Sequence, residues 1–167
     1  MRVLVAFGST RGGTRGLAYM VADGLRDQGL TVDARPANAV RKLSGYDAVV
    51  VGGALYAGRW HQAARQFVIR HRSYLLECPT YFFSSGPLDE SASDGDIPPV
   101  KGVEALMRQV TARGHVTFGG RLDEGARGFL ARAIAKKHAG DWRDDAQVRR
   151  WTATIAAELR EAVPLGA

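Results

Sequence analysis

The strongest constraint on the fold is the start of the chain, where a short apolar run enters a turn of glycine and hydroxyl residues. Residues 2–7 read RVLVAF, and residues 8–14 read GSTRGGT. Large apolar residues then recur every four positions from Leu17 to Leu25, which is typical of one face of a helix. The pattern predicts a buried strand at 2–7, a polar turn, and a helix at 13–28.

The rest of the chain alternates in the same way between apolar runs and amphipathic stretches. The further predicted elements are strands at 30–35, 48–51, 80–83 and 115–118, and helices at 60–76, 103–110, 125–138 and 145–162. Five strands that alternate with helices indicate a parallel sheet covered on both faces. We therefore predict an α/β fold: a single domain over 1–167 with a three-layer, doubly wound, five-stranded parallel sheet. One extra helix is expected between the last strand and the last helix.

Composition and charge narrow the classes of function. The chain has 167 residues, of which 46% are hydrophobic and 24% charged, which is typical of one globular domain. Its 23 Lys and Arg against 17 acidic residues give a net charge of +6, which favours anionic partners. No basic stretch is interleaved with aromatic residues, so we expect no nucleic-acid partner. The single cysteine excludes an intramolecular disulfide, and the four scattered histidines show no metal-site spacing.

The chain carries no sign of membrane insertion or export. No apolar run approaches the ~18 residues of a membrane span, and the N-terminus lacks the pattern of a signal peptide. We therefore expect a cytoplasmic protein. The predicted helix at 125–138 has a basic side with Arg127, Arg132, Lys136 and Lys137. This helix could touch an anionic membrane surface, or it could simply cover the sheet with its basic side in water.

The turn after the first strand is suited to bind a phosphate. Glycines let backbone N–H groups converge on an anion, and the N-terminus of the following helix favours negative charge. The turn lacks the lysine of a P-loop and the G-x-G-x-x-G pattern of dinucleotide sites, so a terminal phosphate monoester fits best. The alternative is an ordinary capped turn. The predicted phosphate-binding segment is Ser9, Thr10, Arg11, Gly12, Gly13 and Thr14. Within it we expect the Arg11 side chain to point into water.

This turn resembles the phosphate loop of the flavodoxin family. The positions that carry the resemblance are Phe7, Ser9, Gly12, Thr14 and Ala18. Ala6 departs from the larger apolar residue that the family prefers, which should affect packing in the sheet rather than phosphate binding. The resemblance implies FMN as cofactor and a flavodoxin-like strand order of 2-1-3-4-5, with the ligand beyond the carboxyl ends of the strands.

Two later loops are candidates for holding a flavin ring. The third strand is expected to end at Gly52-Gly53, after which Tyr56 and Trp60 could stack on the ring or could simply pack. After the fourth strand, backbone N–H groups could bind the flavin carbonyls, unless this segment is only a connecting turn. The acidic residues 89–96 could gate a substrate or form a solvated loop. The predicted ring-binding residues are Ala54, Leu55, Tyr56, Ala57, Gly58, Trp60, Ser84, Ser85, Gly86 and Pro87.

Residues 52–68 resemble one flavodoxin-like branch, the menaquinone-linked protoporphyrinogen dehydrogenases of bacterial haem synthesis. The matching residues are Gly52, Ala54, Leu55, Gly58, His61, Phe67 and Val68. The branch has an aromatic residue before the glycine, where this chain has Ala57, with Tyr56 one place earlier. Residues 125–140 occupy the place of the branch's extra segment. The resemblance implies an FMN-dependent oxidoreductase, with a quinone or a porphyrinogen as candidate substrate.

The net charge favours an FMN-dependent oxidoreductase over an electron carrier. Electron-carrier flavodoxins are typically acidic, so a net charge of +6 argues against a carrier and predicts a milder, higher two-electron potential. A flavodoxin-type electron-transfer protein, an NAD(P)H-dependent flavin or quinone reductase, and a sensor module without redox chemistry stay open. No catalytic residue is identified. His61 is the nearest acid–base candidate, with capping or packing as its alternative, and Cys78 is expected to be buried. The oligomeric state stays open.

Overall fold

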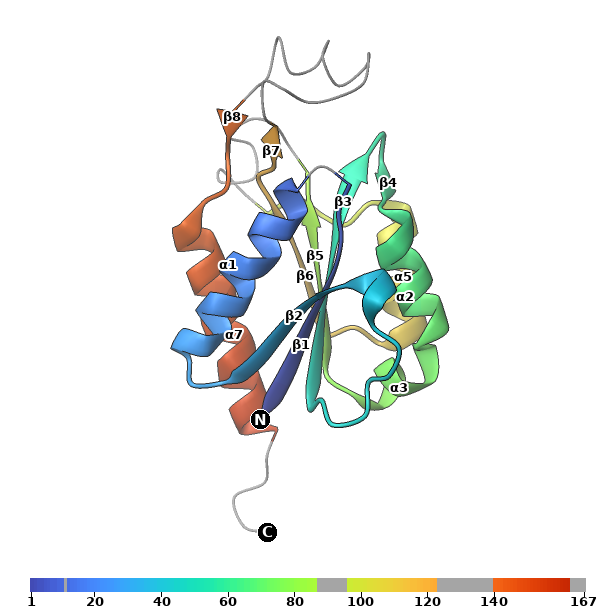
Figure 1. Ribbon diagram of the computed structural model, residues 1–167, viewed down its shortest axis with the longest axis vertical. Coiled ribbons are helices and arrows are strands. Elements are labelled where there is room, and N and C mark those ends of the chain that lie inside the picture. Colours follow the sequence, from blue (N-terminus) through green and yellow to red (C-terminus); the bar gives the residue numbers. More distant parts are fainter. Residues whose placement is uncertain (11, 87–95, 123–139, 163–167) are drawn as a thin grey trace.

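The centre of the structure is a parallel sheet (Figure 1). The computed structural model describes residues 1–10, 12–86, 96–122 and 140–162. The parallel strands are β1 (Arg2–Gly8), β2 (Thr31–Pro36), β3 (Ala48–Tyr56), β5 (Thr80–Ser85) and β6 (Gly114–Phe118). They lie in the order β2-β1-β3-β5-β6, which confirms the predicted order 2-1-3-4-5.

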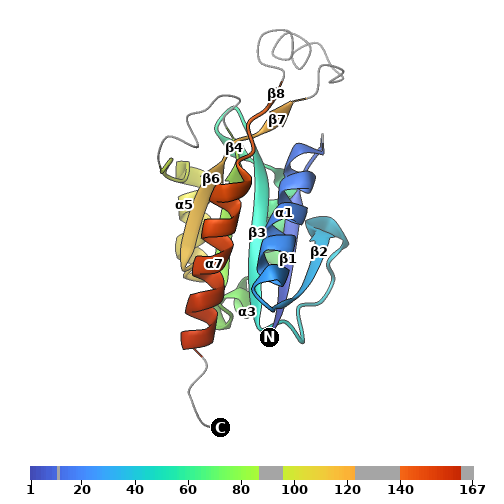
Figure 2. The same cartoon turned by 90° about the vertical axis from the view of Figure 1, so that its left-hand side faces the viewer.

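Helices cover both faces of this sheet, which gives three layers (Figures 1 and 2). Figure 2 shows α1 and α7 side by side on one face. The helices are α1 (Gly13–Asp27) and α7 (Asp145–Glu161) on that face, and α2 (Gln62–Arg70), α3 (Arg72–Glu77) and α5 (Lys101–Val110) on the other. A short 3-10 turn, η1 (Ala37–Ala39), follows β2.

The first strand shows how the sequence divides the core into two halves. Successive side chains of a strand point to opposite faces of the sheet. Val3, Val5 and Phe7 accordingly join the buried cluster beneath α1 and α7, whereas Leu4 and Ala6 join the cluster beneath α2, α3 and α5. Because both faces are covered, the strand reads as a continuous apolar run, as a buried parallel strand should.

The third strand does not end at Gly52-Gly53, so that prediction is wrong. β3 continues to Tyr56. A Cβ atom on Gly52 would lie 1.9 Å from Cζ of Phe83, and one on Gly53 would lie 2.5 Å from Nε1 of Trp60. The two glycines therefore leave room for aromatic rings that lie against the strand, and they do not terminate it.

The segment predicted as one helix at 60–76 begins differently. Arg59–Trp60 form β4, which pairs antiparallel with the end of β3. The turn between these strands has φ 48° at Ala57 and φ 71° at Gly58, and positive φ at both central residues is what a type I′ hairpin requires. The helical part starts at Gln62 and is divided at His71 into α2 and α3.

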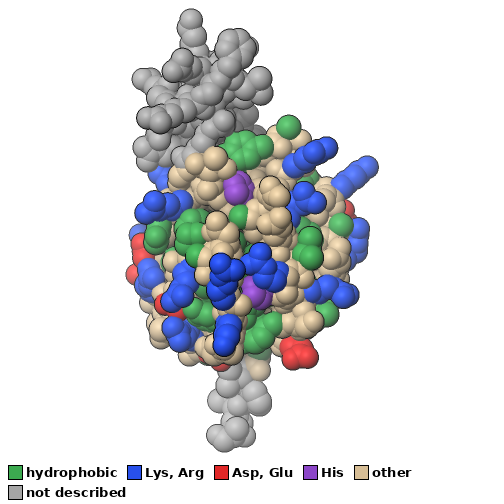
Figure 3. Space-filling model, turned by 45° about the vertical axis from the view of Figure 1, so that its right-hand side comes forward, with side chains coloured by type: hydrophobic (Ala, Val, Ile, Leu, Met, Phe, Trp, Pro, Cys, Tyr) green, Lys and Arg blue, Asp and Glu red, His purple; other side chains and the backbone are tan. Residues whose placement is uncertain are grey.

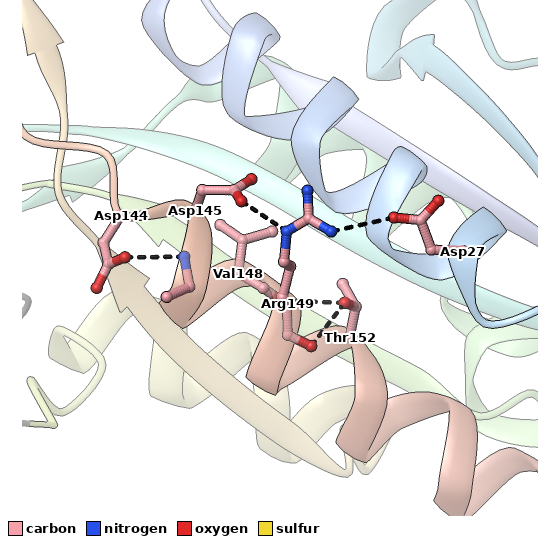
Figure 4. A network of polar contacts seen from close by, with 7 residues as sticks. Asp27, Asp144, Asp145, Val148, Arg149 and Thr152 are labelled. Carbon is pink, nitrogen blue, oxygen red and sulfur yellow. Dashed lines mark hydrogen bonds and ion pairs between the residues drawn. The ribbon is translucent and has the colours of Figure 1, made fainter.

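The last helix is capped at its start and forms one ion pair with the first helix (Figure 4). Asp144 caps α7, as its sequence position predicts, by accepting a hydrogen bond of 2.8 Å from a backbone N–H of the first turn. Arg149 donates from Nε to Asp145 at 2.6 Å, and its Nη1 lies 3.4 Å from Asp27 on α1. Of these contacts, only the exposed Arg149–Asp27 pair joins α7 to α1.

Beyond the sheet, β7 (Arg121–Leu122) pairs antiparallel with β8 (Gly140–Asp141). The helix predicted at 125–138 falls between them and lies outside the described residues. Within the described ranges, no helix is long and apolar enough to cross a membrane.

Candidate functional site

The three loops predicted to bind a cofactor follow strands that are neighbours in the sheet. β1, β3 and β5 run parallel, so their carboxyl ends meet at one edge. The register pairs Gly8 with Gly53 and Gly53 with Ser84 across these strands. Segments more than 70 residues apart in the chain, Gly8 and Ser84, therefore come together at the upper edge of the sheet in Figure 1.

The first loop is a tight turn closed by its own side chain. The N–H of Gly12 donates to Oγ of Ser9 at 3.2 Å, and Gly12 has φ 83°, in the left-handed region that favours glycine. Gly12 is also the N-cap of α1, and its carbonyl accepts from the N–H of Gly16 at 2.9 Å. The first N–H groups of a helix have no partner inside the helix, so this turn presents donors to an anion.

The hydroxyl residues of this loop differ in exposure. Thr10 is exposed, Ser9 is half-buried, and Thr14 in the first turn of α1 is buried. The Ser9 and Thr10 side chains are therefore the hydroxyls that a ligand can reach most directly. Arg11 lies outside the described residues, so its expected orientation stays a prediction.

His61 joins the first loop to the start of α2. Its Nε2 lies 2.8 Å from Oγ1 of Thr10, and its Nδ1 accepts a hydrogen bond of 3.2 Å from the N–H of Ala63. A neutral imidazole nitrogen that accepts carries no proton, so the proton of this ring is on Nε2 and is donated to Thr10. Burial lowers the pKa of His61, which favours this neutral form. His61 therefore caps α2, one of the roles expected from the sequence.

The imidazole of His61 lies against the end of β1, which is possible only because residue 8 is a glycine. A Cβ atom on Gly8 would lie 2.7 Å from Nδ1 of His61 and 2.9 Å from the backbone nitrogen of Ala64. Any larger residue at the end of β1 would displace the imidazole or the start of α2. The packing at Gly8 therefore helps to fix the position of His61 beside the first loop.

The second loop presents one exposed aromatic ring. Tyr56, at the end of β3, is 41% exposed, and the turn residues Ala57 and Gly58 are exposed as well. Ala54 is buried and Leu55 is half-buried. Tyr56 is therefore the aromatic residue of this loop whose ring a planar ligand can reach.

Trp60 has the packed environment that was one of its two expected alternatives. It is only 4% exposed, and its ring stacks on Phe82 with centroids 5.0 Å apart and an interplanar angle of 27°. Since β4 folds back along β3, the indole lies in the core over Gly53. This burial favours the packing alternative for Trp60, so we leave it out of the residues proposed to contact a flavin ring.

In the third loop, a backbone N–H expected to be open to a ligand is already hydrogen-bonded within the protein. The N–H of Gly86 donates to the carbonyl of Phe118 at 3.1 Å, so it is not open to a flavin carbonyl while this bond is kept. Ser84 and Ser85 are buried. Pro87 and the acidic residues from 89 to 95 lie outside the described part of the chain.

Two side-chain contacts, one at this edge and one further inside the sheet, could not be found from the sequence. Oγ of Ser84 lies 2.9 Å from Nε2 of His115, and burial lowers the pKa of His115 to about 4, so the ring is neutral at pH 7. This pair is 31 residues apart in the chain, and the Thr10–His61 pair is 51 apart. Neither spacing carries a local signal, because strand register and hairpin geometry bring the partners together.

The described residues contain no other obvious reactive centre. They include no group of three or more His, Cys, Asp or Glu that could hold a metal ion. Cys78 is partly buried, and burial raises the pKa of its thiol to about 11, so it stays protonated at neutral pH.

A groove of about 520 Å³ lies beside the hairpin, between β4, α2 and α5. Its lining includes Arg59 from β4, and Arg65 and Ile69 from α2. All three are exposed. Figure 3 shows Lys and Arg side chains gathered on the face that includes these helices. This face is therefore suited to anionic groups.

Comparison with known proteins relates the sequence to one family. A family model described as flavodoxin domain matches residues 4–144. A protein of Escherichia coli (strain K12) named protoporphyrinogen IX dehydrogenase [quinone] is 30% identical over 86 residues, which cover 50% of this chain and 48% of that protein. Proteins of the same name from strains O6:H1 and O157:H7 match to the same extent. The chain thus aligns with about half the length of these curated relatives.

Solved structures share the arrangement of the whole chain. The rubredoxin oxygen:oxidoreductase of Desulfovibrio gigas has a TM-score of 0.67 at 14% identity, over 98% of this chain and 37% of that chain. A flavodoxin from the domain Archaea has a TM-score of 0.63 at 15% identity, over 96% and 99%. The flavodoxin of Streptococcus pneumoniae TIGR4 has a TM-score of 0.61 at 18% identity, over 95% and 99%. At these identities the likeness establishes the fold alone.

Proposed function

Because the chain belongs to the flavodoxin domain family, a family of flavoproteins, we propose that it is an FMN-dependent oxidoreductase. The observation that carries the choice of FMN is the first loop. It offers the hydroxyls of Ser9 and Thr10 and the N-terminus of α1, around a turn closed by Gly12. Neutral donors at a helix N-terminus suit the phosphate monoester of FMN.

The residues at the other loops fit the rest of such a cofactor. Tyr56 is the last residue of β3, where the second loop begins, and its ring is exposed. Gly58 in the adjoining turn allows the backbone to approach a ring closely. We propose that Tyr56 forms one wall of the flavin site, with Leu55 and Ala57 beside it. Ser84 and Ser85 shape the floor from β5, where both are buried.

Bound FMN would supply the redox chemistry, and the chain's own groups would set its position and surroundings. No acidic side chain is among the residues proposed for this site, so a reduced, anionic flavin meets less repulsion than in an acidic carrier. The chain has a net charge of +6. We expect a comparatively high two-electron potential, compatible with a quinone as electron acceptor.

We propose a porphyrinogen or a similar anionic reductant as the electron donor. Support comes from the name of the curated relatives and from the charge of the face around the groove. Arg59 and Arg65 are exposed there, near the second loop. Carboxylates on a macrocycle would meet these guanidinium groups with favourable charge.

The first experiment is a titration of the purified chain with FMN, followed by quenching of flavin fluorescence. Riboflavin, which lacks the phosphate, is the matched ligand. Clearly tighter binding of FMN supports the role of the first loop, and equal or absent binding would overturn it.

A second assay tests the reaction. The holoprotein should oxidise protoporphyrinogen with menadione as acceptor, and the fluorescence of the porphyrin product reports the rate. Oxidation of NAD(P)H without porphyrinogen turnover would instead support a flavin or quinone reductase. A holoprotein that is active in neither assay but exchanges electrons with a redox partner would support an electron carrier.

A further inference from the structure

We infer that His61 is a positioning residue for the cofactor phosphate: its Nε2–H turns the hydroxyl hydrogen of Thr10 toward a phosphate monoester. The inference rests on the proposed function, since it describes how the first loop prepares for FMN. Two hydrogen bonds of one imidazole ring carry it.

The first step is the position of the ring. The Nδ1 of His61 accepts from the N–H of Ala63 at 3.2 Å, which caps α2. The ring also lies over Gly8, where a Cβ atom would come within 2.7 Å of Nδ1. These two constraints hold the imidazole plane, so its Nε2 is directed at the first loop.

The second step is the direction of the proton. Since Nδ1 accepts, the neutral ring has its proton on Nε2, which lies 2.8 Å from Oγ1 of Thr10. Thr10 therefore accepts from His61, and the single hydroxyl hydrogen of Thr10 must point elsewhere. The hydroxyl of Ser9 is likewise an acceptor, because its Oγ accepts a hydrogen bond of 3.2 Å from the N–H of Gly12. Each hydroxyl accepts from the protein and keeps its own hydrogen for another partner.

The direction of the Thr10 hydrogen matters for binding a phosphate. A phosphate dianion accepts hydrogen bonds, so a hydroxyl stabilises it only when the hydrogen points at it. With the opposite tautomer, Thr10 would donate to His61 and turn a lone pair toward the anion. When the hydroxyl of Thr10 is already oriented before binding, less entropy is lost as the phosphate binds.

The test separates the cap from the contact to Thr10. In His61→Asn, the side-chain oxygen can still accept from the N–H of Ala63, because asparagine is a good N-cap, but it is too short to donate to Thr10. In Thr10→Val the hydroxyl is removed. Thermal unfolding of the apoproteins checks that both variants are folded.

We expect Thr10→Val to weaken FMN binding by about tenfold, close to the lower end for a hydrogen bond to a charged group, and His61→Asn by about fivefold, the size of a hydrogen bond between neutral groups. Riboflavin binding should be unchanged in both variants. In the double variant, His61→Asn should add no further loss to that of Thr10→Val, because His61 acts through the threonine. Long-range ¹H–¹⁵N correlation spectra of the FMN complex should show the proton of His61 on Nε2.

The outcomes distinguish the inference from the proposed function. Failure of the unmutated protein to bind FMN overturns both. Equal FMN affinity of the unmutated protein and His61→Asn overturns the positioning role alone. A further loss in the double variant shows that His61 contacts the phosphate directly, and a proton on Nδ1 shows that Thr10 donates to the ring; either result also overturns the role proposed here.

Discussion

Replacing Gly52 with alanine is a sharp test of the packing that supports the second loop. The new methyl group would lie 1.9 Å from Cζ of Phe83 and 2.4 and 2.5 Å from its two Cε atoms. Carbon atoms in contact are normally about 3.5–4.0 Å apart, so the ring would have to move by roughly 1.5–2 Å. It has little room, because Phe83 is fully buried and packs against Phe118 and Trp151 at centroid distances of 6.0 and 6.2 Å.

We expect Gly52→Ala to lower the free energy of unfolding by about 3 kcal/mol, at the upper end for overpacking. Phe83→Leu removes the three atoms that clash and should by itself lower it by about 1–2 kcal/mol, through the space left behind. The double variant should be no less stable than Phe83→Leu. The two substitutions would then couple by about 3 kcal/mol.

The assay is urea unfolding followed by circular dichroism, with the slope of the transition compared among variants. Gly102→Ala is the matched control: a Cβ atom there meets nothing within 4 Å, and the residue lies in α5. That substitution should leave stability unchanged or raise it by at most about 0.5 kcal/mol, because alanine favours a helix more than glycine but the residue lies in the first turn. Additive losses in the Gly52→Ala/Phe83→Leu double variant would refute the conclusion that the Phe83 ring packs directly against Gly52.

Three further predictions concern stability. Ala57→Gly should raise the free energy of unfolding in urea by about 0.5 kcal/mol, since relief of the positive φ of 48° outweighs the backbone entropy of glycine; a loss would contradict a strained turn. Between pH 6.5 and about 4 the unfolded chain protonates His115 while the folded chain does not, because burial lowers its pKa to about 4. Stability measured by urea unfolding should therefore decrease as the pH is lowered from 6.5 to about 4, by at most about 3 kcal/mol, and His115→Gln should reduce that decrease. An unchanged slope in this variant would argue that His115 is not held neutral. Arg149→Ala should leave the midpoint of urea unfolding essentially unchanged, because the pairs of Arg149 with Asp145 and Asp27 are exposed; a clear drop in the midpoint would contradict this.

The layered fold was predictable because its signals are local. A strand buried on both faces reads as a continuous apolar run, and a helix that covers a sheet has apolar residues every three or four positions. β1 and α1 carry both patterns without interruption, so their limits were predicted within about a residue. The turn between them was equally readable, since Gly12 and the hydroxyl residues act within a few positions of one another.

The candidate site was only partly predictable, because some of its residue types have two meanings. Gly52-Gly53 was interpreted as the end of a strand, whereas the pair lies inside β3 and makes room for two rings. Trp60 was interpreted as a candidate to stack on a flavin ring, with packing as the alternative, and the hairpin carries it into the core against Phe82. A sequence states that these residues are small or aromatic, and it does not state what they face.

The sequence by itself determined the order of strands and helices and the chemistry of the first loop, since both depend on neighbours in the chain. Only the tertiary structure decided which side chains distant in the chain meet. The hydrogen bond from His61 to Thr10 spans 51 residues, and that between Ser84 and His115 spans 31. Such contacts depend on strand register and on the closeness that Gly8 permits, and neither is encoded in the local pattern around the residues that meet.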